Sequence, residues 1–353
     1  MRVGVAMSGG VDSSLAAALL LEQGHAPQGY FMELPLPRAE ERWQRVRAVA
    51  DQLGIPLRRV DLRQFFQTHV IKPFVAAWRQ GRTPNPCVVC NAAVKFGALL
   101  EVASSDGMAA LATGHYVRLA RDGHGSFRVR QALDRGKDQS YFLCRLPAAS
   151  LERLLFPLGA LHKDDVRARA VALGLVTARE SQDVCFLEGT SVPELLARHG
   201  VVAPPGRIVT GDGRELGHHQ GIHCYTVGQR RGLGQPDRSP WYVLRLDGGH
   251  NQVVVGKAEE LFTRRLLLRE LDWRGPPPPW QGHVRLRSRQ RECAARLLPR
   301  HDGGWPVECD EPQRAVTPGQ YAVFYDGEQV IGSGEILCPL PEDGDGTGRG
   351  EGR

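Results

Sequence analysis

The chain lacks any run of eighteen apolar residues, the shortest stretch that indicates a membrane-spanning helix. Its N-terminus carries a candidate strand where a signal peptide would have its apolar segment. Cysteine is scarce as well: eight are scattered along 353 residues, which does not fit the disulfide framework of a small secreted domain. We therefore expect a cytoplasmic protein with no membrane contact, whose cysteines are thiols, catalytic groups or metal ligands.

The most informative segment present is a glycine- and serine-rich loop between a candidate strand, residues 2–7, and a candidate helix, residues 13–23. It reads Met-Ser-Gly-Gly-Val-Asp-Ser-Ser from Met7 to Ser14. Such glycines let backbone N–H groups approach phosphate oxygens, and a helix N-terminus adds partial positive charge. No Gly-Lys-Ser/Thr closes the loop, so it is not a Walker loop. It resembles the PP-loop of the ATP pyrophosphatases, which split ATP between the α and β phosphates to adenylate a substrate. A plain turn is the alternative.

The first part of the chain alternates strand and helix signals. Further candidate strands cover residues 28–32, 57–62 and 108–115, and a candidate helix covers 39–53. This rhythm predicts an α/β fold with a doubly wound parallel sheet, whose ligands bind at the carboxyl ends of the strands. From residue 204 short strands and glycine-rich turns take over, with Asp326-Gly327 as a hairpin signal.

At 353 residues the chain is long for one domain, and the pattern divides it into parts. We expect a PP-loop domain over residues 1–195, a small β-rich central domain over 196–256, a second β-rich domain over 257–340 and a disordered tail over 341–353. The net charge of +6 is compatible with a polyanionic partner, although many non-binding proteins share it.

Six further segments carry motifs. They are Gly-Arg-Thr-Pro-Asn-Pro-Cys-Val-Val-Cys-Asn (81–91), Gly-His-Tyr (114–116), Lys-Asp-Gln-Ser-Tyr-Phe-Leu (137–143), Ser-Gln-Asp-Val-Cys-Phe (181–186), Tyr-Thr-Val-Gly-Gln-Arg-Arg-Gly-Leu-Gly (225–234) and Val-Thr-Pro-Gly-Gln-Tyr-Ala-Val-Phe-Tyr (316–325). In this order they resemble the tRNA-specific 2-thiouridylase family of PP-loop ATP pyrophosphatases, which puts sulfur on the wobble uridine of certain tRNAs. The resemblance covers residues 2 to about 337.

The resemblance implies a three-domain enzyme that ends in a β-barrel. It would be an ATP- and Mg²⁺-dependent tRNA-uridine 2-sulfurtransferase that releases AMP and pyrophosphate. Cys90 matches the nucleophilic cysteine, and Cys185 matches the cysteine that carries the persulfide. The positions that contact the nucleotide are Ala6, Met7, Ser8, Gly9, Gly10, Val11, Asp12, Ser13, Met32 and Gly114. The positions that contact tRNA are Asn85, Pro86, Cys87, His115, Lys137, Asp138, Gln139, Arg287, Ser288 and Gln320.

The chemistry agrees with this set of residues. Sulfuration of a uracil C2 carbonyl requires an activated oxygen, which ATP can supply, and a sulfur nucleophile, which a cysteine persulfide can supply. A second thiol can then release the sulfur and close a transient disulfide. The partners are tRNA and a sulfur donor, either a protein (a cysteine desulfurase or relay carrier) or inorganic sulfide. Asp12 is expected to hold Mg²⁺ or to anchor loop N–H groups.

The sequence departs from the family pattern at three places. Cys87 stands where aspartate is usual, Arg287-Ser288 replaces a basic–aromatic pair, and the segment between Met32 and Trp43 is short. With Cys87 there are three candidate thiols, Cys87, Cys90 and Cys185, which is enough to hold a [4Fe–4S] cluster with one open iron. The other interpretation, which we favour, treats Cys87 as a tolerated replacement and Cys90 with Cys185 as a redox pair.

Two alternatives come from other classes of protein. One is another PP-loop ATP-dependent ligase, which would not need paired cysteines; the other is a non-catalytic sulfur carrier or tRNA-binding protein, which would not need an intact loop. In the last β-rich part, Arg285, Arg287, Arg289 and Arg291 alternate with other residues. On a strand this spacing would place four guanidinium groups on one face, as a solvated face or, the interpretation we favour, as a track for phosphates.

Overall fold

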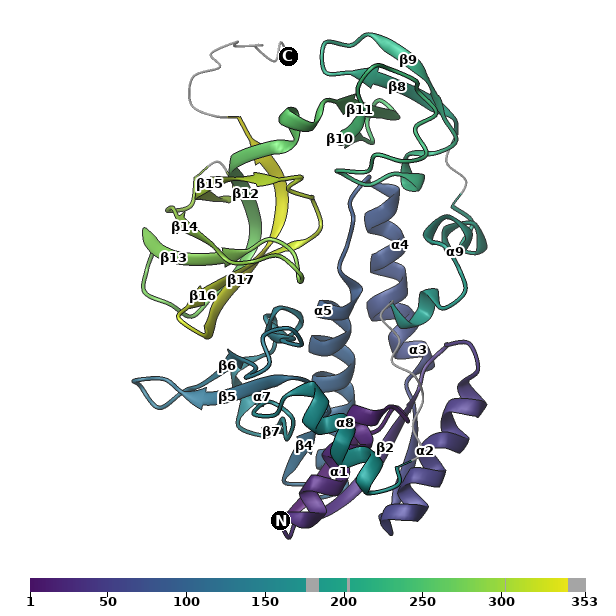
Figure 1. Cartoon of the computed structure of the whole chain (residues 1–353), viewed down its shortest axis with the longest axis vertical. Helices are drawn as coiled ribbons and strands as arrows, with labels where there is room; N and C mark the ends of the chain where they lie inside the picture. Colours follow the sequence, from purple (N-terminus) through teal and green to yellow (C-terminus); the bar gives the residue numbers. More distant parts are fainter. Residues whose placement is uncertain (176–183, 202–203, 302, 342–353) are drawn as a thin grey trace. The chain divides into compact units, whose positions relative to one another are not determined.

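The structure is a computed structural model that describes residues 1–175, 184–201, 204–301 and 303–341 (Figure 1). These residues form two compact units. Unit 1 contains Met1–Phe74, Asn85–Ser191 and Tyr325–Ile331, and unit 2 contains Val75–Pro84, Val192–Phe324 and the chain from Gly332. The predicted tail from residue 342 and the start of the motif at 181–186 lie outside the described residues.

Unit 1 is built on a parallel sheet with the strand order β3-β2-β1-β4-β7. Its strands are β1 (Arg2–Ala6), β2 (Ala26–Glu33), β3 (Leu57–Asp61), β4 (Ala110–Ala112) and β7 (Leu154–Leu155). From β1 the chain adds β2 and β3 on one side of the sheet and then β4 and β7 on the other side. The switch point of the sheet therefore lies between β1 and β4. Ligands of open parallel sheets bind outside the carboxyl ends of the strands at this point.

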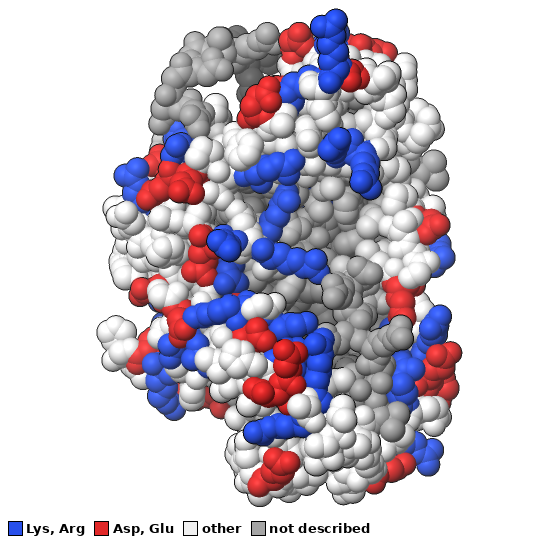
Figure 2. All heavy atoms as spheres, in the orientation of Figure 1, with Lys and Arg blue, Asp and Glu red and all other residues white. Residues whose placement is uncertain are grey.

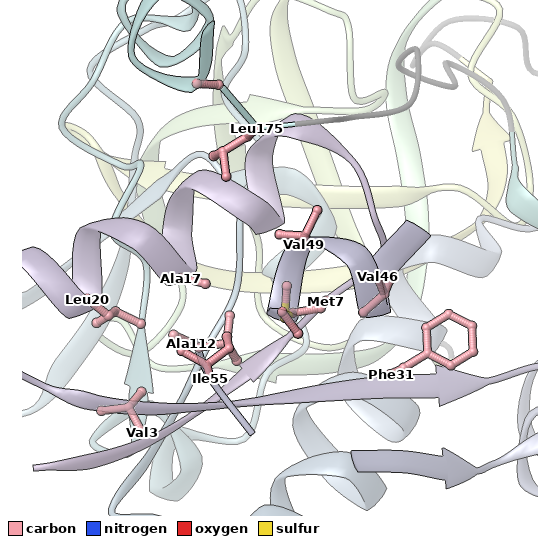
Figure 3. Packing of buried hydrophobic residues seen from close by; sticks show 13 residues of the cluster. Val3, Met7, Ala17, Leu20, Phe31, Val46, Val49, Ile55, Ala112 and Leu175 are labelled. Carbon is pink, nitrogen blue, oxygen red and sulfur yellow. The ribbon is translucent and has the colours of Figure 1, made fainter. Parts of the chain in front are cut away.

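Helices cover both faces of this sheet. On one face, Val3 and Val5 of β1 share a buried cluster with residues of α1 (Val11–Glu22), α2 (Ala39–Leu53) and α8 (Lys163–Ala172) (Figure 3). On the other face, a Cβ on Gly4 would lie only 3.2 Å from Ala103 Cβ of α6 (Leu99–Ser105). The glycine therefore lets α6 approach closely, and the predicted doubly wound α/β fold is confirmed.

One long helical run carries two of the candidate thiols. It begins with α5 (Pro86–Cys90), continues as a π-helix, η2 (Asn91–Ala98), and ends as α6. The 20 residues of Pro86–Ser105 are long and apolar enough to cross a membrane by length and composition. Val88, Val94, Phe96 and Leu99 are nevertheless buried in the protein, as in the core helix of a folded domain.

The remaining elements of unit 1 are short. They are α3 (Arg63–Phe66), the π-helix η1 (Gln67–Ile71), the hairpin β5 (Val117–Arg121) with β6 (Phe127–Gln131), η3 (Ser140–Leu143), α7 (Ala148–Leu151) and η4 (Cys185–Leu187). The hairpin was not predicted. Its Arg130 pairs with Gln329, so the segment Tyr325–Ile331 extends this ladder inside unit 1.

Unit 2 contains the predicted β-rich parts. After α9 (Val192–Arg198), a four-stranded sheet has the order β10-β11-β8-β9, formed by β8 (Gly206–Thr210), β9 (Glu215–His219), β10 (Tyr242–Asp247) and β11 (Gln252–Gly256). Short 3-10 turns, η5 (Ile222–Cys224) and η6 (Ala258–Leu261), flank these strands, and α4 (Lys72–Arg79) leads from unit 1 into unit 2.

The last strands form a closed barrel, as the resemblance implied. They are β12 (Phe262–Trp273), β13 (Trp280–Arg285), β14 (Cys293–Leu297), β15 (Trp305–Arg314), β16 (Tyr321–Asp326) and β17 (Gln329–Leu340). Their order is β12-β15-β14-β13-β16-β17, and β17 pairs back with β12. Gly327, at φ 55°, makes the predicted hairpin turn between β16 and β17.

The core of unit 1 yields a stability prediction. Leu20 of α1 is 1% exposed in the cluster of Figure 3, whereas its neighbour Leu21 is 37% exposed. We expect Leu20→Ala to lower the free energy of unfolding by about 2–5 kcal/mol, because it removes buried methyl groups and leaves a cavity. Leu21→Ala, the matched control, should change it by less than about 1 kcal/mol. Urea unfolding of both variants measures the difference, and equal losses would contradict the assigned core face.

Candidate active site

The glycine-rich loop follows β1 at the switch point of the sheet. Gly9 has φ +77°, a conformation that side chains rarely adopt, and α1 starts at Val11 without a side-chain cap on Gly10. Its first backbone N–H groups therefore have no helical partner and are suited to an anion. Ser8 N–H donates to Ser13 Oγ over 3.2 Å, which holds the loop in a closed turn.

A second loop, after β4, packs directly on the first. A Cβ on Gly114 would lie 2.6 Å from the backbone C of Asp12 and 2.8 Å from Ser13 N. Only glycine fits this approach. Met7 donates its N–H to Tyr30 O of β2 over 2.9 Å, and Met32 lies near the carboxyl end of the same strand. The structure thus gathers at one edge of the sheet the predicted nucleotide positions from three separate segments, 6–13, 32 and 114.

Asp12 has partners that the sequence did not predict. Its Oδ1 accepts hydrogen bonds from Tyr116 Oη over 2.7 Å and from Lys163 Nζ over 2.6 Å. Lys163, on the first turn of α8, is 4% exposed, so its charge is buried against this carboxylate. The expectation that Asp12 anchors loop N–H groups is replaced by this contact. The available signal was a lysine on the first helical turn, where the helix dipole disfavours a cation.

Two of the thiols lie on the first turn of the long helical run. Asn85 is the extended N-cap residue and Pro86 is the first helical residue, a position that proline favours. Cys87 and Cys90, three residues apart, therefore share a helix face. The predicted stiff loop ends at Asn85, and a helix takes over from there.

Cys185 reaches the same neighbourhood from a distant part of the sequence. It begins η4, and the next residue, Phe186, packs its ring against Phe66 and Phe74 with centroid separations of 5.9 and 5.1 Å. An ion pair between Arg42 and Glu188 closes the turn on the other side. The charge of Cys185, if ionised, acts on both Cys87 and Cys90, which places the three thiols within electrostatic range of one another.

The surroundings of the thiols favour the protonated form. Burial raises the pKa of Cys90 to about 12, and the neighbouring thiols add to this while Lys95 opposes it. Burial likewise raises the pKa values of Cys87 and Cys185, and Lys95 again lowers both. Lys95 lies in the π-helical stretch, five residues after Cys90. Because the i to i+5 hydrogen bonds of a π-helix bring residues five apart to one face, Lys95 lies on the same side of the helix as Cys90.

His115 is the other group that Lys95 affects. Burial lowers its pKa well below the usual value, and Lys95 adds to the effect, so the imidazole is neutral at pH 7. Its Nδ1 lies 2.7 Å from Thr113 Oγ1, and its ring packs against Phe96 and Phe156. The structure therefore places His115, a predicted tRNA contact, in an apolar setting close to Lys95.

The Lys137–Gln139 triplet is largely occupied by internal contacts. Asp138 Oδ1 accepts from Ala132 N–H over 2.9 Å, and Gln139 Oε1 accepts from Tyr116 N–H over 2.9 Å. Because Tyr116 also bonds Asp12, these contacts connect the triplet to the glycine-rich loop. The side chains of Asp138 and Gln139 hold the loop in place.

Arg287, Ser288 and Gln320 lie in unit 2. Arg287 Nη2 donates to Thr317 Oγ1 over 2.6 Å, and Gln320 Nε2 donates to Thr83 O over 2.7 Å. The predicted arginine face is wrong, because β13 ends at Arg285 and the chain then turns through Arg287–Gln290. Arg285 is paired with Glu292 at 2.8 Å, so the four arginines do not form one row.

The three-thiol metal site also lacks geometric support. Within the part of the chain that the structure describes, which includes Cys87, Cys90 and Cys185, no three or more His, Cys, Asp and Glu side chains are arranged to hold a metal ion.

These features define an α/β nucleotide-binding protein of the PP-loop class, with thiols in the same unit. Family models match three successive parts of the chain: the tRNA methyl transferase HUP domain over residues 1–189, the tRNA methyl transferase PRC-barrel domain over 194–257 and the aminomethyltransferase beta-barrel domain over 263–336.

Curated relatives cover almost the whole chain. The tRNA-specific 2-thiouridylase MnmA of Chloroflexus aggregans is 45% identical over 95% of this chain and 98% of its own length. That of Magnetococcus marinus is 43% identical over 95% and 99%. The chain therefore belongs to the tRNA-specific 2-thiouridylase family. Among solved structures, a 4-thiouridine synthetase–RNA complex with bound ATP covers 49% of this chain and 41% of its own, at 19% identity and a TM-score of 0.32, a similarity too low to define the fold.

The thiol environment yields a prediction on pH. With the pKa of Cys90 raised to about 12, its thiolate fraction, and with it the rate of iodoacetamide alkylation, should rise about tenfold per pH unit from pH 7 to 10. Lys95→Gln should slow alkylation at every pH in this range, because it removes the charge that opposes burial. Lys72→Gln, at an exposed lysine of α4, is the control. Peptide mass spectrometry follows Cys90 alone, and a plateau below pH 9 would contradict the burial effect.

Proposed function

We propose that this protein is an ATP-dependent tRNA-uridine 2-sulfurtransferase that converts the wobble uridine of its substrate tRNAs to 2-thiouridine. The observation that carries the proposal is the combination, within unit 1, of a PP-loop at the switch point and three thiols within range of one another. The family membership supports the same assignment, since the curated relatives are named tRNA-specific 2-thiouridylases. The cytoplasm, where tRNA is available, is the proposed location.

The loop at 6–13 fits a nucleotide polyphosphate. The uncapped N-terminus of α1, the positive φ of Gly9 and the close approach of Gly114 provide a backbone surface without side chains. Ser8 and Ser13 would hold phosphate oxygens, and Lys163 would offset their charge. Mg²⁺, held by Asp12 with phosphate oxygens, would neutralise the departing pyrophosphate. Asp12 fits this role because Tyr116 and Lys163 both bond its Oδ1 and not its Oδ2.

The proposed reaction has two stages. In the first, the uridine O2 attacks the α-phosphorus of ATP, pyrophosphate leaves, and C2 carries an adenylated oxygen. In the second, the terminal sulfur of a persulfide on Cys185 attacks C2, and the C2–O bond breaks to release AMP. The Cys90 thiolate then attacks Cys185 Sγ, so that the S–S bond to the transferred sulfur breaks and a Cys90–Cys185 disulfide forms. A thiol reductant regenerates the pair.

Cys87 has no required step in this scheme. Among the residues that the structure describes, no three His, Cys, Asp or Glu side chains are arranged to hold a metal ion, and the scheme uses no iron–sulfur cluster. In the proposal, Asn85, Pro86 and Cys87 contact the target base at the helix start. The sulfur donor is a protein that delivers persulfide, a cysteine desulfurase or a relay carrier, or else inorganic sulfide. Sulfide would attack Cys185 Sγ of the Cys90–Cys185 disulfide, so that the disulfide is the oxidant, Cys90 leaves as a thiol and Cys185 becomes the persulfide. The tRNA body contacts His115, Lys137 and the unit 2 residues Arg287, Ser288 and Gln320.

The two stages can be separated by mutation. Cys90→Ser and Cys185→Ser should each lower 2-thiouridine formation by more than about 10²-fold while tRNA-dependent pyrophosphate release persists. Asp12→Ala should lose both activities, because it disturbs the loop and removes the carboxylate that faces the buried ammonium of Lys163. Cys338→Ser, at a half-buried thiol of the barrel, is the matched control and should retain both. Thiolation at the normal rate in Cys90→Ser would contradict the proposal. Release of pyrophosphate in the absence of tRNA would instead indicate a ligase of another kind.

Cys87 gives a second test. Because the scheme needs only two thiols, Cys87→Asp and Cys87→Ala should keep at least about a tenth of the activity in air with a persulfide donor. Liquid chromatography of nucleosides from digested tRNA measures the product. Two results together would contradict the two-thiol scheme and favour a cluster: loss of all activity in both variants, and an unmodified protein that is inactive in air and regains activity with iron and sulfide.

A further inference from the structure

Three arginine side chains of unit 1 converge on one carboxylate. Arg118 Nη2 lies 2.8 Å from Glu328 Oε2, and Arg130 and Arg135 also form ion pairs with this glutamate. Arg118 comes from β5, Arg130 from β6 and Arg135 from the loop that precedes Lys137. Glu328 stands at the turn between β16 and β17. We call these four residues the arginine cluster.

The cluster is accessible. Its arginine side chains are 28%, 33% and 47% exposed for Arg118, Arg130 and Arg135, and that of Glu328 is 33% exposed. Figure 2 shows Lys and Arg side chains gathered over the region of β5 and β6, with Asp and Glu side chains among them. The surface can therefore be reached by a macromolecular partner without rearrangement of the core.

The charges in the cluster do not balance. Burial disfavours the charge of Glu328, but Arg118, Arg135 and Arg130 together hold its pKa below the usual value, so it is ionised at neutral pH. One negative charge then faces three positive charges, and two positive charges remain. The other hydrogen bonds of the arginines go to neutral groups: Arg118 Nε donates to Gln131 O, and Arg135 Nη1 donates to Gln131 Oε1. Buried Arg130 Nε has no hydrogen-bond partner.

Structural need alone does not account for three arginines. The hairpin is already tied to the Glu328 turn by the backbone bond from Gln131 N–H to Glu328 O at 2.9 Å. A partly exposed ion pair adds at most about 1 kcal/mol, and each further arginine brings repulsion between like charges. Several arginines held in fixed positions, with more positive than negative charge, are instead typical of a phosphate-binding surface. The planar guanidinium group binds a phosphate through two parallel hydrogen bonds.

We propose that Arg118, Arg130 and Arg135 form a docking site for backbone phosphates of the tRNA substrate, with Glu328 holding the three side chains in position until RNA is bound. This inference rests on the proposed function. Arg135 lies close in sequence to Lys137 and Gln139. Gln139 Oε1 accepts from Tyr116 N–H, and Tyr116 Oη donates to Asp12 of the glycine-rich loop. RNA bound at the cluster would therefore lie beside the loop whose hydrogen bonds support the ATP site.

The test compares one arginine that lies among other arginines with one that lies among acidic residues. Arg135→Glu reverses the most exposed charge of the cluster. Arg63→Glu is the control, because Arg63 is 56% exposed and lies among the acidic residues Glu33 and Asp61. We expect Arg135→Glu to weaken tRNA binding about tenfold near 0.1 M salt and to lower the slope of log affinity against log salt by about one. The KM for tRNA should rise with it, while kcat at saturating tRNA stays unchanged, and Arg63→Glu should alter none of these.

Glu328→Gln is the second variant, and it keeps the shape of the side chain. If the cluster binds phosphates, removing its one negative charge should tighten tRNA binding several-fold, the opposite sign to Arg135→Glu. If the four residues only brace the hairpin, Glu328→Gln should leave tRNA affinity unchanged and lower the melting temperature, which overturns the inference. An Arg135→Glu variant that binds tRNA normally but responds poorly to a protein sulfur donor would overturn the inference as well.

These outcomes are separable from failure of the proposed function. Binding is measured directly on tRNA with the full chain, without ATP or sulfur donor. An unmodified protein that binds tRNA in a cluster-dependent way but never thiolates it would refute the sulfurtransferase assignment and retain the docking site.

Discussion

The contact on which the functional site most depends is the pair between the Asp12 carboxylate and the buried ammonium of Lys163. It joins the glycine-rich loop after β1 to the start of α8, which follows 151 residues later in the chain. Tyr116 shares the same oxygen and brings in the loop after β4. Because Lys163 is buried, loss of the Asp12 carboxylate should cost more than the roughly 1 kcal/mol of an exposed ion pair. The loops that surround the switch point are therefore held by electrostatics as well as by packing.

A different balance governs the thiols. They lie where a long helix begins, yet burial outweighs every favourable charge and keeps them protonated at neutral pH. Lys95 is the cation that opposes this effect at all three, and it also acts on His115. In the proposed scheme a persulfide suits such a site, because its terminal sulfur is more acidic than a thiol and needs less help to ionise. The same apolar setting would exclude water from the activated uridine and so limit its hydrolysis.

Local signals predicted most of unit 1 but not its long-range contacts. The helix at 39–53 and the strand at 57–62 were predicted within a residue of α2 and β3, because caps, glycines and periodicity are local. The strand expected at 108–115 is only Ala110–Ala112, because the loop after it turns at once to pack Gly114 on Asp12. The prediction of one row of arginines was wrong, because the alternation of residues alone does not show where β13 ends. The roles of Lys163 and Glu328 could not be predicted, since each meets its partners across more than a hundred residues.

In the proposed reaction, the PP-loop domain activates the uridine oxygen itself. A tRNA whose wobble uridine carries ¹⁸O at O2 tests this most directly, with mass spectrometry of the AMP formed in one turnover. Attack of O2 on the α-phosphorus followed by sulfur substitution at C2 leaves that oxygen on phosphorus. One ¹⁸O in each AMP, in step with each 2-thiouridine formed, is therefore the predicted result. Unlabelled AMP alongside normal formation of 2-thiouridine would contradict the account, because the oxygen would then have left by another route.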